Sequence, residues 1–345
     1  QWTVDELDEK LPAPVKAYIA KNNINFYIIN AIKVAKEIGL GNKTNTVLQS
    51  AFFSIANIIP AEDAIKYMKK AAYKSFAKKG DDIVKMNYAA IEKGAGEVIK
   101  VDVPASWADA EGTLPVHTAT GDRKDLVDFV NNILIPVNAQ RGDKLPVSTF
   151  VGMADGTFPQ GSAAYEKRGI AVDVPVWHSE NCIQCNICSY VCPHAVIRPV
   201  VMTDAELKKA PKLAQEKAVA MTGMPGYNFV MTMSALDCTG CGVCANICPA
   251  GAKDKSKSAL VMKPIETQMD QQPVFDYAVS KVSDKPEVHE KFKENTVKGS
   301  QFKQPLLEFS GACAGCGETP YAKIVTQLFG DRMYIANATG CSSIR

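Results

Sequence analysis

The chain has 345 residues, of which 46% are hydrophobic and 22% are charged, and its formal net charge at pH 7 is +2. This length leaves room for two or three domains, and the balanced charge gives no indication of a nucleic-acid-binding surface. The longest apolar run, around residues 51–59, is too short to cross a bilayer, and no secretory signal opens the sequence. Because the sequence begins at Gln1 and stops at Arg345, after a strand-like segment, we expect an internal piece of a longer polypeptide.

The first third of the chain has an α/β pattern. Residues 24–38 read as a short strand followed by a helix that Gly39 ends. Gly39 and Gly41 lack the third glycine of a dinucleotide-binding loop, so we interpret Gly39 as a helix C-terminal glycine. Further helical patterns are predicted at about residues 46–58, 61–78 and 81–93.

Two segments without a helical period follow. Residues 101–115 are rich in proline and glycine and are predicted to be a linker. Residues 144–176 are predicted to form a small irregular or β-rich connector.

Eleven cysteines are present, and eight of them form two copies of the pattern C-x-x-C-x-x-C-x-x-x-C-P. The first copy contains Cys182, Cys185, Cys188 and Cys192, and the second contains Cys238, Cys241, Cys244 and Cys248. In bacterial ferredoxins, three cysteines of such a run bind one 4Fe-4S cluster and the fourth binds the other cluster. We therefore predict one cluster bound by Cys182, Cys185, Cys188 and Cys248, and a second bound by Cys238, Cys241, Cys244 and Cys192.

The spacing suits a cubane because one tight turn delivers successive soft thiolates to neighbouring irons. Pro193 and Pro249 then end each turn without an amide donor, and Gly240 and Gly242 allow close backbone approach. Structural zinc is the competing interpretation, but it does not require a triplet with a distant fourth cysteine before proline, twice. Eight cysteines in cluster spacing rather than disulfides indicate a reducing, cytoplasmic compartment.

Strand-like segments flank each cysteine run, at residues 169–177, 196–202, 227–234 and 259–265. They predict a two-hairpin ferredoxin-like core. A helical insert at about residues 203–226 separates the repeats, and Thr203 with Glu206 has the spacing of a capping box.

Cys313, Cys316 and Cys341 form a third group. Thr319 as N-cap, Pro320 and Gly330 delimit a predicted helix, and residues 332–339 a following strand. Both cysteine segments would then meet at one edge of an α/β unit. By itself the CAGC sequence leaves a redox dithiol, half of a zinc site and half of a cluster site open.

Along essentially its whole length, the chain resembles the pyruvate:ferredoxin (flavodoxin) oxidoreductase family. The resemblance rests on ADGTFPQGSAAYEKRGIAVDVP (residues 154–175), the paired cysteine runs, GACAGCGETPY (residues 311–321) and ATGCSSI (residues 338–344), in that order. It implies an α/β multidomain fragment with four parts: the C-terminal part of a γ-like domain (1–127), an EKR connector (128–176), a ferredoxin-type domain (177–270) and the start of a thiamin diphosphate-binding domain (271–345).

For function, the resemblance implies a cytoplasmic, homodimeric enzyme that oxidatively decarboxylates pyruvate with coenzyme A and passes electrons through three 4Fe-4S clusters to ferredoxin or flavodoxin. Cys313, Cys316 and Cys341 match ligands of the third cluster, and Glu318 and Cys341 match positions that contact thiamin diphosphate. Without the resemblance, Glu318 would be interpreted as an acid favoured by the helix dipole. The magnesium-binding Gly-Asp-Gly segment is missing, so we expect the fragment alone to be inactive.

A different class of function remains open from the residues. The chain could be a non-catalytic 4Fe-4S electron carrier whose CAGC sequence forms a separate zinc or redox site.

Overall fold

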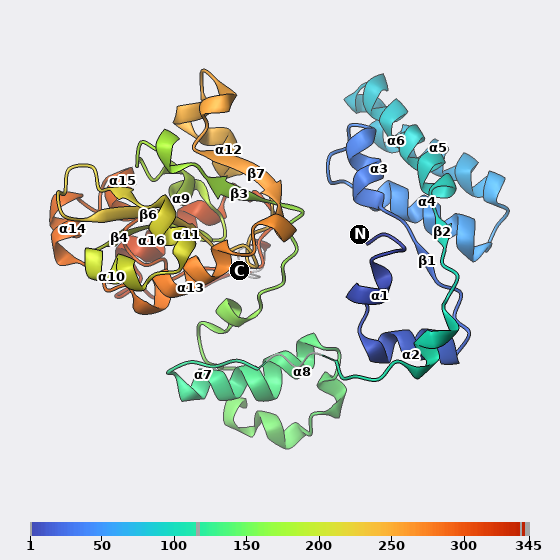
Figure 1. Cartoon of the computed structure of the whole chain (residues 1–345), viewed down its shortest axis with the longest axis horizontal. Coiled ribbons are helices and arrows are strands. Elements are labelled where there is room, and N and C mark those ends of the chain that lie inside the picture. Colours follow the sequence, from blue (N-terminus) through green and yellow to red (C-terminus); the bar gives the residue numbers. More distant parts are fainter. Residues whose placement is uncertain (1, 115–117, 339, 342–345) are drawn as a thin grey trace. The chain divides into compact units, whose positions relative to one another are not determined.

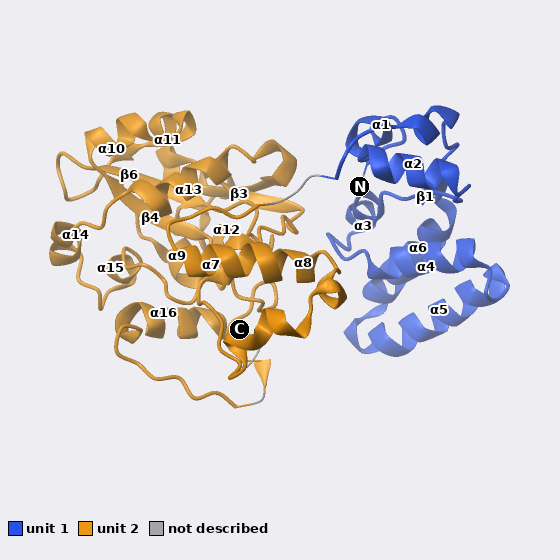
Figure 2. Cartoon of the chain, turned by 90° about the horizontal axis from the view of Figure 1, so that it is seen from below, with its two compact units in different colours: residues 1–117 blue, residues 118–345 orange. Residues whose placement is uncertain are grey.

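The computed structural model describes residues 2–114, 118–338 and 340–341. It divides into two compact units, residues 1–117 and 118–345 (Figure 2). None of the described helices is both long and apolar enough to span a membrane.

The first unit is built mainly from helices. The helices predicted from the periodicity are confirmed to within a few residues, because each has a continuous amphipathic pattern of its own. Only one pair of two-residue strands joins them in the described part of this unit, β1 with β2, in antiparallel register. The elements are α1 (Leu7–Lys10), α2 (Ala13–Lys21), β1 (Tyr27–Ile28), α3 (Ala31–Glu37), α4 (Asn45–Ala56), α5 (Ala61–Phe76), α6 (Asp81–Gly96) and β2 (Ile99–Lys100).

Gly39 follows the end of α3 in a left-handed conformation, with φ of 83°. Its N–H donates to the carbonyl of Lys36 at 3.2 Å, and the N–H of Leu40 donates to Ala35 at 2.9 Å. These bonds satisfy carbonyls at the helix end, as a C-terminal glycine does. The interpretation of Gly39 as a helix terminator is therefore confirmed.

The predicted linker at residues 101–115 is partly wrong. Ala105–Asp109 form a 3₁₀ helix, and the side chain of Trp107 is buried against Leu7 and Ile19. The indole N–H of Trp107 also donates to Asp8 Oδ1 at 2.9 Å. The proline- and glycine-rich composition predicted a linker, but burial of the one large aromatic side chain, Trp107, packs this segment against the core.

The second unit opens with a helical and irregular segment. It contains α7 (Lys124–Phe129), a π-helical turn (Val130–Leu134), α8 (Ile135–Asn138) and three 3₁₀ helices (Gly142–Lys144, Val147–Met153 and Ser162–Tyr165). No strand lies within residues 144–172, where the irregular form of the predicted connector is observed. The last four residues of the predicted range 144–176 belong to a strand, β3 (Asp173–Trp177).

The four strands around the cysteine runs are confirmed, but their pairing is not that of two successive hairpins. The outer strands of the two repeats pair antiparallel, β3 with β7, and the inner strands pair likewise, β4 with β6 (Figure 1). Each pair thus takes one strand from each repeat, because their apolar faces cover a shared core rather than two separate ones. The strands are β3 (Asp173–Trp177), β4 (Ile197–Met202), β6 (Asn228–Met233) and β7 (Leu260–Pro264).

The predicted helical insert contains two short helices and a strand. Thr203 and Glu206 form the predicted capping box at the start of α10 (Asp204–Lys209). After α11 (Lys212–Lys217), β5 (Val219–Ala220) adds to the edge of β6. The capping box is confirmed because all its contacts lie within four consecutive residues.

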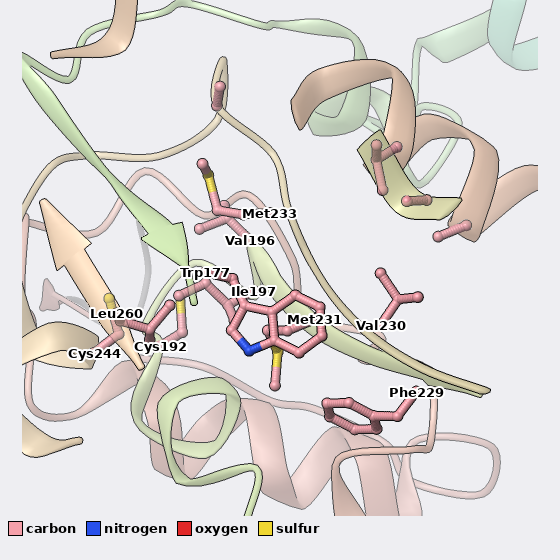
Figure 3. Close-up of a cluster of buried hydrophobic side chains, with 14 of the residues drawn as sticks. Trp177, Cys192, Val196, Ile197, Phe229, Val230, Met231, Met233, Cys244 and Leu260 are labelled. Atoms are coloured by element: carbon pink, nitrogen blue, oxygen red, sulfur yellow. The ribbon is translucent and has the colours of Figure 1, made fainter. Parts of the chain in front are cut away.

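One hydrophobic core serves both repeats. Figure 3 shows Cys192 of the first run and Cys244 of the second within the same buried cluster as Trp177 and Phe229. The rings of Trp177 and Phe229 meet edge to face, with centroids 5.9 Å apart. The cysteines therefore lie in an apolar interior.

In the last part of the unit, the described residues form four α-helices: α13 (Gln271–Lys281), α14 (Pro286–Lys291), α15 (Val297–Ser300) and α16 (Thr319–Phe329). The helix predicted before Gly330 is confirmed as α16. Its N-cap is Glu318 rather than the predicted Thr319, which starts the helix.

The predicted strand at residues 332–339 is wrong for residues 332–338, and Thr339 lies outside the described residues. Tyr334 and Ile335 are exposed, and none of the described strands pairs with this segment. A short apolar segment forms a strand only when a neighbouring strand pairs with its backbone hydrogen-bonding groups.

Candidate iron-sulfur site

The two cysteine runs fold into the same local structure. In each run the third cysteine lies in a one-turn helix and the fourth caps its end: α9 (Ile187–Val191) precedes Cys192, and α12 (Val243–Ile247) precedes Cys248. Proline follows directly in both runs, so the chain leaves the loop without an unpaired N–H.

Two positions in each loop have left-handed backbone. In the second run these are Gly240 and Gly242, with φ of 67° and 72°, as the glycines suggested. In the first run the equivalent residues are Gln184 and Asn186, with φ of 55° and 62°. A residue with a side chain adopts this conformation at a cost of about 1–3 kcal/mol, so the surroundings must hold it.

Side-chain hydrogen bonds hold the first loop in this conformation. Gln184 Nε2 donates to the carbonyl of Ala220 at 2.8 Å, and its Oε1 accepts from the N–H of Thr222 at 2.9 Å. Asn186 Nδ2 donates to the carbonyl of Lys298 at 2.9 Å. Sequence reasoning missed Gln184 and Asn186, although alignment of the two runs places them opposite the glycines.

Backbone amides point at the first sulfur of each run. The N–H of Gln184 donates to Cys182 Sγ at 3.4 Å, and the N–H of Gly240 donates to Cys238 Sγ at the same distance. Such bonds stabilise negative charge on sulfur, which is the form that binds iron.

Two cavities group the eight cysteines into two sets of four. One cavity is lined by Cys182, Cys185, Cys188 and Cys248. The other is lined by Cys192, Cys238, Cys241 and Cys244. Each cavity thus has three cysteines from one run and the fourth from the other, in the same sets as the ligation hypothesis.

The donor set fits iron–sulfur cubanes. No group of three or more His, Cys, Asp or Glu side chains in the described parts of the chain is arranged to hold one metal ion. A cubane does not need that arrangement, because each thiolate binds a different iron. The residues around the two cavities are mostly apolar, which excludes water from the sulfurs.

Burial disfavours the thiolate form of three of these cysteines. It raises the pKa of Cys238 to about 12 and those of Cys188 and Cys244 well above the ordinary value. Cys248 differs: burial acts in the same direction, but hydrogen bonds from the backbone at Ala259 and Ala250 bring its pKa below the ordinary value. Raised pKa values keep Cys188, Cys238 and Cys244 in the thiol form, which is a poor nucleophile, until a bound metal displaces the proton.

The loop of the third cysteine group lies against the second cavity. At Gly315, where φ is 73°, an added Cβ would lie 3.5 Å from both Cys241 Cβ and Val243 Cγ2. The N–H of Phe309 donates to the carbonyl of His194 at 2.9 Å, and His194 Nδ1 lies 3.1 Å from the carbonyl of Ser310. This segment is thereby tied to the residues that follow Cys192.

Within the third group, the N–H of Cys316 donates to the carbonyl of Cys313 at 3.0 Å. Cys313 and Cys341 are exposed and Cys316 is partly buried. The convergence of Cys341 with the other two cysteines stays a prediction. Glu318 is exposed at the N-terminus of α16, where its carboxylate suits the helix dipole.

Comparison with protein families assigns most of the chain. Residues 3–97 match the pyruvate ferredoxin/flavodoxin oxidoreductase family, and residues 181–252 match a 4Fe-4S dicluster domain. Residues 119–171 match a family described as a domain of unknown function, EKR.

Curated relatives match nearly the whole chain. The pyruvate-flavodoxin oxidoreductase of Enterobacter agglomerans is 50% identical over 343 residues, which are 99% of this chain and 28% of that protein. The pyruvate:ferredoxin oxidoreductase of Moorella thermoacetica is 51% identical over 344 residues, with the same coverage. The chain matches the pyruvate:ferredoxin/flavodoxin oxidoreductases. A pyruvate dehydrogenase [NADP(+)] of Cryptosporidium parvum is also 43% identical, over 99% of this chain and 18% of that protein.

The chain spans a little over a quarter of the length of the oxidoreductases it matches. The predicted domain boundaries stay predictions. What is present is an oxidoreductase-family segment followed by a 4Fe-4S dicluster domain.

Proposed function

We propose that this chain is the electron-conducting part of a pyruvate:ferredoxin/flavodoxin oxidoreductase. The observation that carries the proposal is the grouping of cysteines in the two cavities, because each set of four thiols comes from both repeats. The names of the matching oxidoreductases support the assignment.

In the proposed assignment, Cys182, Cys185, Cys188 and Cys248 hold one 4Fe-4S cluster, and Cys238, Cys241, Cys244 and Cys192 hold the other. When bound, such clusters accept and release single electrons at potentials that depend on hydrogen bonds to sulfur and on solvent exposure. The chain supplies both controls: amides at Gln184 and Gly240 donate to sulfur, and an apolar interior excludes water.

Cys313, Cys316 and Cys341 are proposed as ligands of a third cluster, with Glu318 and Cys341 also contacting thiamin diphosphate. The magnesium ion of that cofactor would be bound mostly by residues outside this sequence. The close approach of Gly315 to Cys241 and Val243 supports a third cluster next to the second cavity, because both of these residues line that cavity. Electrons from the thiamin site would then reach the second cavity before the first.

For the whole protein we propose oxidative decarboxylation of pyruvate with coenzyme A, which gives acetyl-CoA and CO₂. Ferredoxin or flavodoxin would accept the electrons. A homodimer in a reducing cytoplasmic compartment is part of the same proposal, which rests on the family resemblance of the sequence.

A ligand-swap experiment tests the crossed assignment. Cys192→Ser should perturb the cluster of the second run. Cys188→Ser, in the helix that Cys192 caps, should perturb the cluster of the first run. After anaerobic purification, electron paramagnetic resonance of each variant would show which cluster changes. If Cys192→Ser altered the cluster held by Cys182 and Cys185 instead, the crossed assignment would be wrong.

Metal analysis separates the enzyme from a simple carrier. Two cubanes require about eight irons, and a third increases the count. Zinc bound at Cys313 and Cys316, with about eight irons elsewhere, would support the non-catalytic carrier. A third cluster together with thiamin diphosphate binding in the intact polypeptide would support the enzyme.

A further inference from the structure

Helix α16 buries its polar face. Thr319, Lys323 and Gln327, which are spaced four residues apart, are buried against the rest of the unit. Tyr321 and Phe329 on another face are largely exposed. A helix packed only by hydrophobic burial would present the opposite face, so the polar stripe must make specific contacts.

Lys323 makes the central contact of this stripe. Its side chain is 1% exposed, and Nζ donates to the carbonyls of Ser189, Tyr190 at 3.2 Å and Cys192 at 3.1 Å. These carbonyls lie at the end of α9, where a helix has unpaired acceptors and partial negative charge. Lys323 therefore caps α9 from a segment more than a hundred residues away.

A chain of buried amides fixes the helix that carries Lys323. Ser189 Oγ donates to Gln301 Oε1 at 3.0 Å, and Gln301 Nε2 donates to Gln327 Oε1 at 3.2 Å. Gln327 Nε2 in turn donates to the carbonyl of Lys303 at 2.9 Å. The network links α9, α15 and α16 into one packed set.

Among the described residues, no carboxylate pairs with the ammonium group of Lys323. Its N–H groups donate to backbone carbonyls instead. Helix α9 holds Cys188, which lines the first cavity, and it leads directly into Cys192, which lines the second. A buried ammonium group thus lies beside the short segment that joins the two proposed cluster sites. Burial lowers the pKa of Lys323 to about 8, which leaves the side chain mostly protonated at pH 7.

We propose that Lys323 is a positioning residue for electron transfer: it holds α9 between the two cluster sites and, by its buried positive charge, raises the reduction potential of both. This inference rests on the proposed function. Reduction adds one negative charge to a cluster, and a cation in a low-dielectric interior stabilises that charge. The effect is larger at the site containing Cys192, whose own carbonyl accepts from Lys323.

The test is a redox titration followed by electron paramagnetic resonance on the protein purified anaerobically with its clusters. Lys323→Met should shift both midpoint potentials to more negative values, with the larger shift at the Cys192 site. Lys323→Gln removes the charge but keeps amide donors, so it should give the same direction of shift even if the methionine variant assembles poorly.

Two controls separate charge from packing. Gln327→Leu breaks the amide chain but keeps Lys323, so it should lower thermal stability with a smaller change in potential. Lys212→Met removes a lysine whose side chain is 89% exposed and should leave both potentials unchanged. Wild-type potentials in Lys323→Gln with its full iron content would overturn the inference.

Failure of the inference differs from failure of the proposed function. If Lys323 has no electrostatic role, two clusters are still present and only the shift is missing. If the chain does not bind two clusters, the wild-type protein itself lacks the two signals.

Discussion

Replacing Lys167 with methionine is expected to loosen the connector from the second cysteine run. Lys167 Nζ pairs with Asp237, whose side chain is only 4% exposed and which directly precedes Cys238. The same ammonium lies 4.8 Å from the ring centroid of Phe309 and 5.9 Å from that of Phe275. One lysine of the EKR sequence thus contacts the cluster-binding loop and the segment that leads to the third cysteine group.

The size of the effect follows from the burial of the carboxylate. Removing one partner of a buried ion pair costs about 3–5 kcal/mol, because the remaining charge is left without compensation. Ser234 Oγ still donates to Asp237 at 2.6 Å, and the Lys167 side chain keeps 22% exposure, so the lower end applies. A loss of about 3 kcal/mol corresponds to a fall of about 6–12 °C in melting temperature for a unit of this size.

The assay is thermal unfolding under anaerobic conditions, followed by circular dichroism and by the visible absorbance of the clusters. Lys167→Arg keeps the charge and should lose less stability than Lys167→Met. Adding Asp237→Asn to Lys167→Met should recover part of the loss, since no buried charge is then left unpaired. A fall of less than about 2 °C, or a double variant less stable than the single one, would refute the reasoning.

Two further substitutions test local structure. Asn186→Ala should lower the free energy of unfolding by about 2 kcal/mol, because alanine keeps the left-handed backbone strain and loses the hydrogen bond to the carbonyl of Lys298. Asn186→Gly relieves the strain and should lose about half as much. Urea unfolding measures both losses. Glu206→Gln should lower the free energy of unfolding by about 2 kcal/mol at pH 7. Burial raises the pKa of Glu206, but hydrogen bonds from Thr203 and Lys285 outweigh it and lower that pKa to about 2. Because the pKa of Glu206 in the folded state lies below the ordinary 4.5, the stability advantage of the wild type is fully present above pH 4.5 and is lost as the pH falls toward 2. Unfolding curves of both proteins at each pH measure this advantage. An advantage that is unchanged at pH 2 would contradict the prediction.

Features that depend on neighbouring residues were readable from the sequence. The capping box at Thr203 and the helix ending before Gly39 involve contacts within a few residues, and both are confirmed. The strands around the cysteine runs also have the predicted positions. The predicted strand at residues 332–338 failed because a strand also needs a partner, which a local pattern does not supply.

The spacing of the cysteines by itself determined the chemistry, since soft thiolates at intervals of two and three residues suit a cubane and form a repeat. Only the tertiary structure decided which strands pair and what holds α9 in place. The strands of different repeats pair across one core, so cysteines from both runs reach each cavity. Lys323 had no sequence signal of its own, and alignment with the glycines of the second run marked only the backbone positions of Gln184 and Asn186. The contacts of all three depend on carbonyls and amides that approach them only when distant segments pack together.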